Sequence, residues 1–229
     1  EFSVLGLDAS IGWVSPTSPA VAGSHSITVN IVNTQSTTIT SLELYYSDGV
    51  NPAVTETFTG LNILPSGNQN FTFTVPYTLS ASVTMTAGIN LVNGVVDNNT
   101  SNNTINYTLC IGLSGTYTIN SALPTSGTNY QTFAAAVSAM SCGIAGPVTF
   151  NVAAGSGPYN EQISIPVIIG SSAVNTITIN GNNNTLTSAG GTDYHTLRLN
   201  GADYLTVNNL NVVTTGATSG FALLLSNSA

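Results

Sequence analysis

The sequence has very little charge. Its 229 residues include no lysine, a single arginine (Arg198) and nine acidic residues, so charged residues make up 4% of the chain and the net charge is -8. Because 42% of the residues are hydrophobic, the surface must be hydrated by Asn, Thr, Ser and Gly, which is unusual for a cytosolic protein. With almost no cation to neutralise phosphate, the chain is expected to bind neither nucleic acid nor an anionic membrane surface.

Long hydrophobic runs are also missing. No stretch reaches the roughly 18 consecutive apolar residues that a membrane-spanning helix requires, so we expect no membrane insertion. The first residues show neither the basic nor the apolar segment of an export signal, and we expect any such signal to lie outside this sequence. The low charge and the lack of a membrane-spanning run together favour an exported protein that is surrounded by water.

Cysteine is scarce as well. The two cysteines, Cys110 and Cys142, enclose the segment 111–141. In an exported protein such a pair favours one disulfide bond, and a pair of free buried thiols is the alternative. Two thiols cannot complete a tetrahedral zinc site by themselves. We predict no metal centre and no cofactor.

Short strands are expected throughout the first half of the chain. Residues 2 to about 110 alternate polar and apolar residues in short runs between turn residues, which is the pattern of an antiparallel β-sandwich. The runs 25–31 and 71–75 alternate most cleanly. Asn93-Gly94 gives the strongest hairpin signal. We predict about seven or eight strands in this half, the last of them near 105–109.

Three segments of this half carry a family resemblance. The loop Asp97-Asn-Asn-Thr-Ser-Asn-Asn103, the turn Pro65-Ser-Gly67 and the strand Phe71-Thr-Phe-Thr-Val75 together resemble the CARDB domains. These are immunoglobulin-like, adhesion-related domains of bacterial surface proteins. The resemblance covers roughly the first half of the chain, and it implies an extracellular spacer or adhesion module without catalytic residues.

The Asp/Asn loop also invites comparison with a calcium site. Asp97, Asn99 and Ser101 alternate like the first ligands of an EF-hand loop. Such a loop needs Gly at its sixth position and Glu at its twelfth, where this sequence has Asn102 and Thr108. We therefore predict a hydrogen-bonded polar turn and no calcium site.

One helix is expected, over about residues 129–141. Apolar residues share one of its faces at helical spacing: Phe133, Val137 and Met140. Thr128 or Asn129 would cap its start, and Gly143 would end it. In a protein of stacked repeats, this helix would cap the first repeat.

The stretch 146–227 has short apolar runs between Asn- and Gly-rich corners. The runs Ile177-Thr-Ile-Asn-Gly181 and Leu197-Arg-Leu-Asn-Gly201 share one pattern, and we take the interval from Ile177 to Leu197 as the period of a repeat. A fixed period near this length, with one strand and one corner in each repeat, is typical of a solenoid. Asn180 and Asn200 would then occupy corners where amide side chains pair along the stack.

The start of this stretch resembles a group of exported proteins. The segments 142–152 and 159–165, which follow the strand Gly115-Thr-Tyr-Thr-Ile119 and the expected helix, are similar to the opening of a right-handed parallel β-helix in large exported proteins of the Bacteroidetes. The resemblance implies export by the type IX secretion system. Pectate lyases and related polysaccharide enzymes share this fold, so the fold leaves the function open.

Ionisable residues are few in the second half. A lyase of this fold would need clustered carboxylates and a basic residue, and a hydrolase would need neighbouring acids. Residues 111–229 offer only five ionisable candidates: Glu161, Asp193, His195, Arg198 and Asp203. Strand alternation would point Arg198 outward and leave His195 at a corner. We predict no catalytic residue, and our candidate ligand or sugar contacts are Asp193, Tyr194, Arg198, Asp203 and Tyr204.

The predicted architecture is all-β. An Ig-like β-sandwich over residues 1–111 would be followed, over 112–229, by the N-terminal cap and first coils of a right-handed parallel β-helix. No capping segment follows the apolar run 221–225, so we expect another copy, or the rest of a longer chain, to cover the last coil.

The predicted function is a non-enzymatic, extracellular structural or adhesion module of a large bacterial cell-surface or filament-forming protein. The alternative is a carbohydrate-active or carbohydrate-binding β-helix fragment. Surface polysaccharide would be the partner in that case.

Overall fold

The computed structural model describes residues 6–189, 194–215 and 220–227. The chain divides into two compact units, Glu1–Cys110 and Ile111–Ala229. The division lies just before the boundary expected from the sequence. Both units are built mainly from strands, so the all-β prediction is confirmed.

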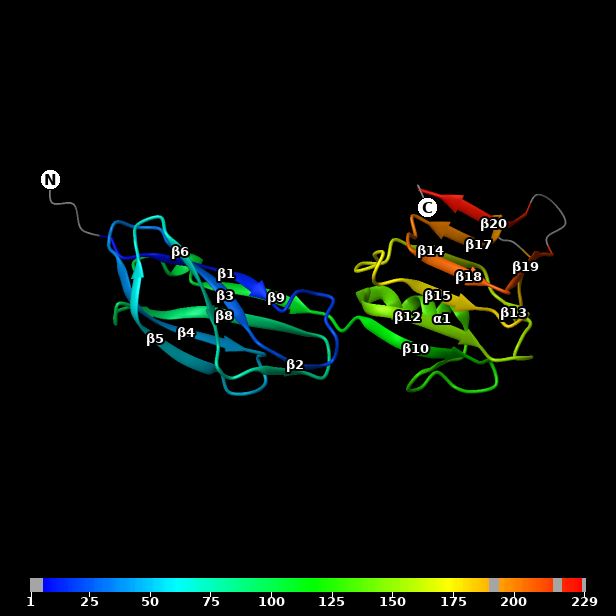
Figure 1. Ribbon diagram of the computed structural model, residues 1–229, viewed down its shortest axis with the longest axis horizontal. Coiled ribbons are helices and arrows are strands. Elements are labelled where there is room, and N and C mark those ends of the chain that lie inside the picture. The colour runs from blue at the N-terminus through cyan, green and yellow to red at the C-terminus, as the bar shows by residue number, and fades with distance from the viewer. Residues whose placement is uncertain (1–5, 190–193, 216–219, 228–229) are drawn as a thin grey trace. The chain divides into compact units, whose positions relative to one another are not determined.

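Antiparallel sheets make up the first unit (Figure 1). The four-stranded sheet has the order β5 (Val54–Ile63), β4 (Ile39–Ser47), β8 (Val83–Val92), β9 (Thr104–Leu109). The three-stranded sheet has the order β1 (Ala9–Ser15), β3 (Thr28–Asn33), β6 (Asn68–Thr72), and β2 (Gly23–His25) pairs with β7 (Tyr77–Leu79). Fully buried side chains come from all three sheets, among them Ile31, Leu44 and Leu79.

The Asn93-Gly94 turn forms as predicted. Asn93 and Gly94 both have positive φ, 51° and 79°, as a two-residue turn of type I′ requires. Val92 and Val95 pair across the turn. The Asn93 side chain also accepts hydrogen bonds from the backbone N–H of Thr40 (2.7 Å) and Ser41 (3.1 Å), so the turn also fixes the start of β4.

Three parallel sheets make up the second unit. The first has the order β11 (Asn129–Tyr130), β10 (Leu113–Ile119), β12 (Ile144–Val152), β15 (Ile177–Asn180), β18 (Leu205–Asn208). The second contains β13 (Tyr159–Asn160), β16 (Thr185–Ser188) and β19 (Asn211–Thr214), and the third contains β14 (Ile163–Pro166), β17 (His195–Asn200) and β20 (Phe221–Ser226). From β12 onward the chain visits the three sheets in turn, so hydrogen-bonded neighbours belong to successive circuits of the chain.

The period predicted from Ile177 and Leu197 is wrong. Ile177–Asn180 and Leu197–Asn200 lie in different sheets. In the first sheet, the asparagines that stack are separated in sequence by 29 positions, from Asn151 to Asn180, and by 28 positions, from Asn180 to Asn208. In the third sheet Ile163 pairs with Leu197, which is a longer interval. The repeat is irregular because the connections between strands differ in length while the register of the strands is kept.

The helix is shorter than predicted. α1 spans Phe133–Ala139 and continues as a 3-10 turn, Met140–Cys142. Its N-cap is Thr132, whose Oγ1 accepts a hydrogen bond from the Ala135 N–H (3.0 Å). The predicted caps, Thr128 and Asn129, were wrong because Asn129 begins β11 and pairs with Thr118. Gly143 ends the segment with a φ of 87°, as predicted.

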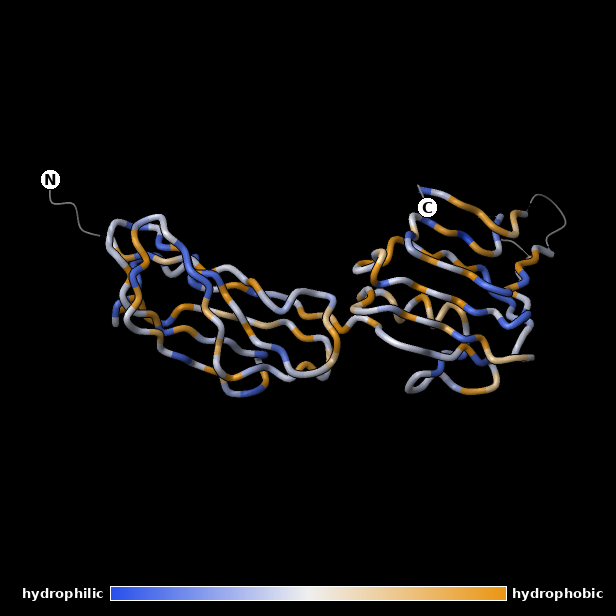
Figure 2. Tube along the Cα trace, viewed as in Figure 1, coloured by the Kyte–Doolittle hydropathy of each residue, from blue (hydrophilic) through white to orange (hydrophobic). Residues whose placement is uncertain are grey.

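α1 buries one face in the core of the second unit. Phe133, Ala136 and Met140 are buried, whereas Val137 is only partly buried. They join a cluster that includes Phe150 and Ile163, and Figure 2 shows the alternation of apolar and polar residues along the strands of this unit. The Phe133 ring meets the Tyr159 ring edge to face at 5.0 Å. The helix thus packs against β10, β11 and β14, at the start of the stack.

Amide side chains pair from strand to strand on the outer face of the first sheet. Asn180 Nδ2 donates to Asn151 Oδ1 (2.9 Å), and Asn208 Nδ2 donates to Asn180 Oδ1 (3.2 Å). Asn200 Oδ1 similarly accepts from Asn227 Nδ2 (2.6 Å). The predicted stacking of Asn180 and Asn200 is confirmed. Beside the first ladder lies a row of four threonines in register: Thr116, Thr149, Thr178 and Thr206.

Gly181 sits where two successive corners touch. Its N–H donates to Asn208 O (2.7 Å). A Cβ atom at Gly181 would lie 2.5 Å from Asn209 O and 2.6 Å from Leu210 Cα. Since both neighbours belong to the backbone of the next corner, a side chain here would push the two circuits apart.

We predict that Gly181→Ala lowers the free energy of unfolding of the second unit by about 1–3 kcal/mol, because overpacking against backbone is not relieved by a rotamer change. Chemical denaturation monitored by circular dichroism measures the effect. Ser164→Ala, on the exposed side of β14, is the control and should change stability by less than about 0.5 kcal/mol. Equal stability of the Gly181 variant and the wild type would contradict the tight contact between corners.

Candidate functional site

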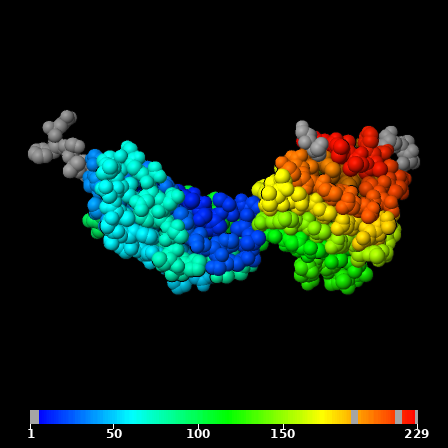
Figure 3. All heavy atoms as spheres, in the orientation of Figure 1, coloured from blue at the N-terminus to red at the C-terminus, as the bar shows by residue number. Residues whose placement is uncertain are grey.

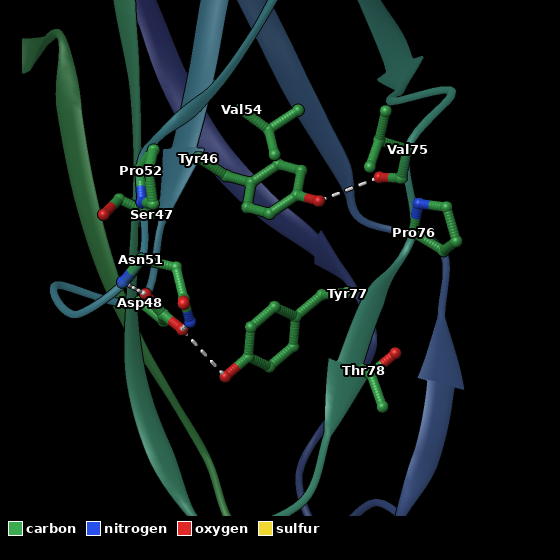
Figure 4. Close-up of a pocket in the computed structure, with 10 residues that line it drawn as sticks. All are labelled: Tyr46, Ser47, Asp48, Asn51, Pro52, Val54, Val75, Pro76, Tyr77 and Thr78. Carbon is green, nitrogen blue, oxygen red and sulfur yellow. Dashed lines mark hydrogen bonds between the residues drawn. The ribbon is translucent and has the colours of Figure 1, made fainter.

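A pocket in the first unit lies between the end of β4, the start of β5 and the segment leading into β7 (Figure 4). Its volume is about 240 Å³. Ten residues line it: Tyr46, Ser47, Asp48, Asn51, Pro52, Val54, Val75, Pro76, Tyr77 and Thr78. The lining combines two phenol rings, one carboxylate and four aliphatic side chains.

Two tyrosines give the pocket its aromatic surfaces. Tyr46 is 3% exposed, and its hydroxyl donates to Val75 O (2.9 Å). Its ring meets the Phe73 ring edge to face at 5.0 Å, which fixes it as a rigid wall. Tyr77 is more exposed, and its hydroxyl points at Asp48 Oδ2 (3.4 Å). Burial, and secondly the Asp48 charge, raise the pKa of both phenols, so both are neutral at physiological pH.

Asp48 supplies a fixed negative charge at the pocket. The turn that follows β4 directs the backbone N–H groups of Val50 (3.0 Å) and Asn51 (2.8 Å) at Asp48 Oδ1. Asn51 Nδ2 donates to the other carboxylate oxygen (2.7 Å). These hydrogen bonds, first that from the Asn51 backbone, lower the pKa of Asp48 to about 2. The carboxylate is therefore ionised throughout the physiological range.

The pocket is lined by groups that suit binding more than proton transfer. Its lining contains no histidine, cysteine, lysine or arginine, and Asp48 is too weak a base to accept a proton near pH 7. The Asp48-Gly49 turn is visible in the sequence as a turn signal. Sequence reasoning missed the pocket because Tyr77 approaches Asp48 from 29 residues away, through β7, and no local pattern records that approach.

The residues expected to contact a ligand in the second unit lie in separate places. Arg198 is in β17, where its Nε donates to Ser226 Oγ (2.8 Å) and its Nη2 to Asn200 Oδ1 (3.1 Å). Tyr194 precedes β17, while Asp203 and Tyr204 precede β18 in a different sheet. The two tyrosines are exposed, and each has a φ above 50°. Asp193 lies outside the described residues.

Other ionisable residues of the second unit have structural contacts. Glu161 accepts hydrogen bonds from the backbone N–H groups of Phe133 (3.1 Å) and Ala134 (2.8 Å), so its carboxylate caps α1 from a distant part of the sequence. His195 begins β17 and is 3% exposed, so it is buried in a strand and does not form an exposed corner. The capping role of Glu161 had no local signal in the sequence.

The Asp97 loop is a hydrogen-bonded turn, as predicted. Asp97 Oδ2 accepts from the Ala9 N–H (2.9 Å), and Oδ1 accepts from the Asn99 N–H (2.8 Å). The side-chain amide nitrogen of Asn103 donates to Asp97 Oδ2 and to Ala9 O, both at 3.0 Å. Within the described ranges, no three residues among His, Cys, Asp and Glu group together as metal ligands.

Cys110 and Cys142 are both disulfide-bonded, so the alternative of free thiols is wrong. The pairing of one with the other stays a prediction. In the part of the chain that the structure describes, the helices are too short or too polar to cross a membrane.

Comparison with known proteins gives only distant likenesses, all of them to solved structures. No protein-family model matches the sequence, and no curated protein matches it. The chain is similar to the crystal structure of a CARDB domain from Pyrococcus furiosus, which was solved in complex with di-metal ions. The two sequences are 17% identical, the match covers 49% of this chain and 99% of that chain, and the TM-score is 0.37. It is also similar to the solution structure of a domain assigned to a cell surface protein of Methanosarcina acetivorans, with 26% identity, coverage of 44% and 90%, and a TM-score of 0.34. Likenesses at these TM-scores carry no function across.

We predict that Asp48 titrates with a midpoint near pH 2, well below the ordinary aspartate value of about 3.9. Its hydrogen bonds therefore stabilise the fold at pH values above about 4, and this contribution is lost as the pH falls through the folded pKa. The side-chain carboxyl chemical shift in a carbon-13 NMR titration measures the midpoint. A midpoint for Asp48 at the ordinary aspartate value would contradict the hydrogen-bonded turn.

Proposed function

We propose that the chain is a non-enzymatic, extracellular structural or adhesion module of a larger bacterial surface protein. In this proposal an Ig-like domain precedes the first coils of a right-handed parallel β-helix. The observation that carries it is the stacking of the second unit, in which each of three parallel sheets gains one strand with each circuit of the chain. Such a stack can be extended indefinitely by adding coils, and this suits a long surface structure.

The outer face of the first sheet supports a structural role. Its outward-facing positions carry mostly Thr and Asn, and the Asn151–Asn180–Asn208 ladder is hydrogen-bonded within the protein. Side-chain ladders of this kind stabilise flat parallel stacks. This surface therefore holds successive coils in register and stays uncharged.

The ionisable side chains of the second unit also support a structural role. Glu161 caps α1, and Arg198 connects β17 to Ser226 at the end of β20. Both charges are thus used to hold elements together. The disulfide-bonded cysteines favour an oxidising, extracellular setting. The resemblance of the sequence from Cys142 onward to exported Bacteroidetes proteins supports type IX secretion as the route.

The last circuit of the stack exposes an apolar row. Phe221, Leu223 and Leu225 of β20 are 58%, 50% and 58% exposed, and β20 forms the red surface of this unit in Figure 3. In the first circuit the same sheet has Ile163 and Ile165 at 3% and 1%. We propose that a further coil of the same kind covers this row. The edge of β20 then gains a partner strand.

The test of a non-enzymatic role is an assay of the purified chain on pectin, alginate and related polymers, with and without calcium. We expect no turnover above that of Arg198→Ala and Asp203→Asn variants. Turnover by the wild type that either substitution abolishes would contradict the proposal. Thermal unfolding of each variant shows whether a lost signal reflects lost chemistry or lost folding.

The test of the open coil is self-association. In the absence of a covering coil, we expect the chain to associate in a concentration-dependent way through β20, because an exposed apolar edge strand pairs with other strands. Analytical ultracentrifugation measures this. The double substitution Leu223→Lys and Leu225→Lys should keep the protein monomeric, and the same charges placed at exposed Ser164 and Thr116, away from the last circuit, should leave association unchanged.

A carbohydrate-binding role is the second candidate. Tyr194 and Tyr204 are 54% and 53% exposed, and exposed aromatic rings can stack on sugar rings. In this case Tyr204→Ala should weaken binding to a polysaccharide column. Unchanged retention of the variant would leave the structural role as the better account.

A further inference from the structure

We propose that the Tyr46–Tyr77 pocket of the first unit binds the side chain of a lysine presented by another protein molecule. The pocket places a carboxylate, an accessible aromatic ring and aliphatic walls around one cavity (Figure 4). A lysine side chain has the matching parts, an ammonium group at the end of a four-carbon stem. The inference rests on the first unit alone and does not depend on the β-helix proposed for the second.

Charge favours a cationic ligand. The described part of the first unit contains five acidic residues and neither lysine nor arginine: Asp8, Glu43, Asp48, Glu56 and Asp97. This unit therefore has a negative field that attracts cations. The single arginine of the chain belongs to the second unit, where it is hydrogen-bonded to Ser226 and Asn200. The lysine must come from outside this sequence, which contains none.

The hydrogen bonds of Asp48 favour ammonium over guanidinium. An arginine prefers to engage both oxygens of a carboxylate with its planar fork. At Asp48, Oδ1 accepts from two backbone N–H groups, while Oδ2 accepts from Asn51 Nδ2 (2.7 Å) and only at long range from the Tyr77 hydroxyl (3.4 Å), so Oδ2 is the oxygen with room for one further donor. An ammonium is a point charge with rotatable donors, so it can use one oxygen and lie against the Tyr77 ring.

The walls of the pocket favour an alkyl stem over a sugar. Pro52, Val54, Val75 and Pro76 supply no side-chain hydrogen-bond donor or acceptor. An amino sugar held against them would leave ring hydroxyls without partners, at a cost in binding free energy. A methylene chain has no such groups. The cavity of about 240 Å³ exceeds the roughly 150 Å³ that holds a benzene molecule, so five non-hydrogen atoms fit.

The test uses the intact chain and Nα-acetyl-lysine methylamide as the probe. Binding is followed by amide chemical shifts of Gly49, Val50 and Tyr77 in an NMR titration. We expect a dissociation constant in the millimolar range, about that of a single anchored side chain. The norleucine analogue, which has the stem without the ammonium, and the arginine analogue should each bind at least about tenfold more weakly. Affinity should fall as salt is added.

Variants separate the pocket from the general negative charge of the unit. Asp48→Asn keeps a side-chain oxygen for the turn and should lower affinity at least about tenfold. Glu43→Gln is the matched control: Glu43 lies in β4, the strand that leads to Asp48, and its Oε1 accepts from Asn90 Nδ2 (3.0 Å), so its loss removes the same charge without touching the pocket. It should change affinity less than about twofold. Thermal unfolding confirms that each variant is folded.

A pocket-filling variant tests the site independently of charge. Val75→Trp adds a ring at an exposed position of the rim and should abolish binding of the lysine probe while Asp48 stays in place. The proposal is overturned if the norleucine analogue binds as tightly as the lysine probe, if Asp48→Asn and Glu43→Gln have equal effects, or if the shifts map away from the pocket. Retained binding by folded Val75→Trp overturns it as well.

Discussion

Parallel, in-register pairing between successive circuits of the chain is the constraint on which the second unit depends. Once Val148 pairs with Ile177, and Ile177 with Leu205, each inward position must be apolar in every circuit. Each outward position must likewise carry a side chain that tolerates a similar neighbour one strand away, at about 4.8 Å. Thr and Asn meet this requirement without electrostatic repulsion, whereas a row of like charges would repel. The low charge of the second unit thus follows from the geometry of stacking.

Local patterns explain which parts of the fold were predictable. The Asn93-Gly94 turn, the Gly143 helix end and the Asn180 stack are each set by neighbouring residues or by the hydrogen-bonding habits of one side chain, and each was found. The period was misread because Ile177–Asn180 and Leu197–Asn200 look alike while belonging to different sheets. Strand pairing of Asn129 with Thr118 overrode the local preference for an earlier helix start.

The candidate sites were harder to predict, since they depend on contacts between distant segments. Glu161 reaches the N-terminus of α1, and Tyr77 reaches Asp48, in each case from a different strand or loop far along the sequence. Neither contact leaves a motif in the sequence. Arg198 is the opposite case. It was a candidate ligand contact because arginine is rare in this sequence, but its hydrogen bonds to Ser226 and Asn200 hold the stack together. In a chain with few charges, scarcity alone does not separate binding residues from structural ones.

The unequal connections between strands have a consequence for how such a chain can change. Between β14 and β15 the chain takes the segment 167–176, whereas between β17 and β18 it needs only 201–204. Both connections join the third sheet to the first, and the strands on either side keep their register. This edge of the stack therefore absorbs insertions and deletions that the paired strands could not accept. Over evolution it is a side on which new loops can be added to the module without a redesign of its core.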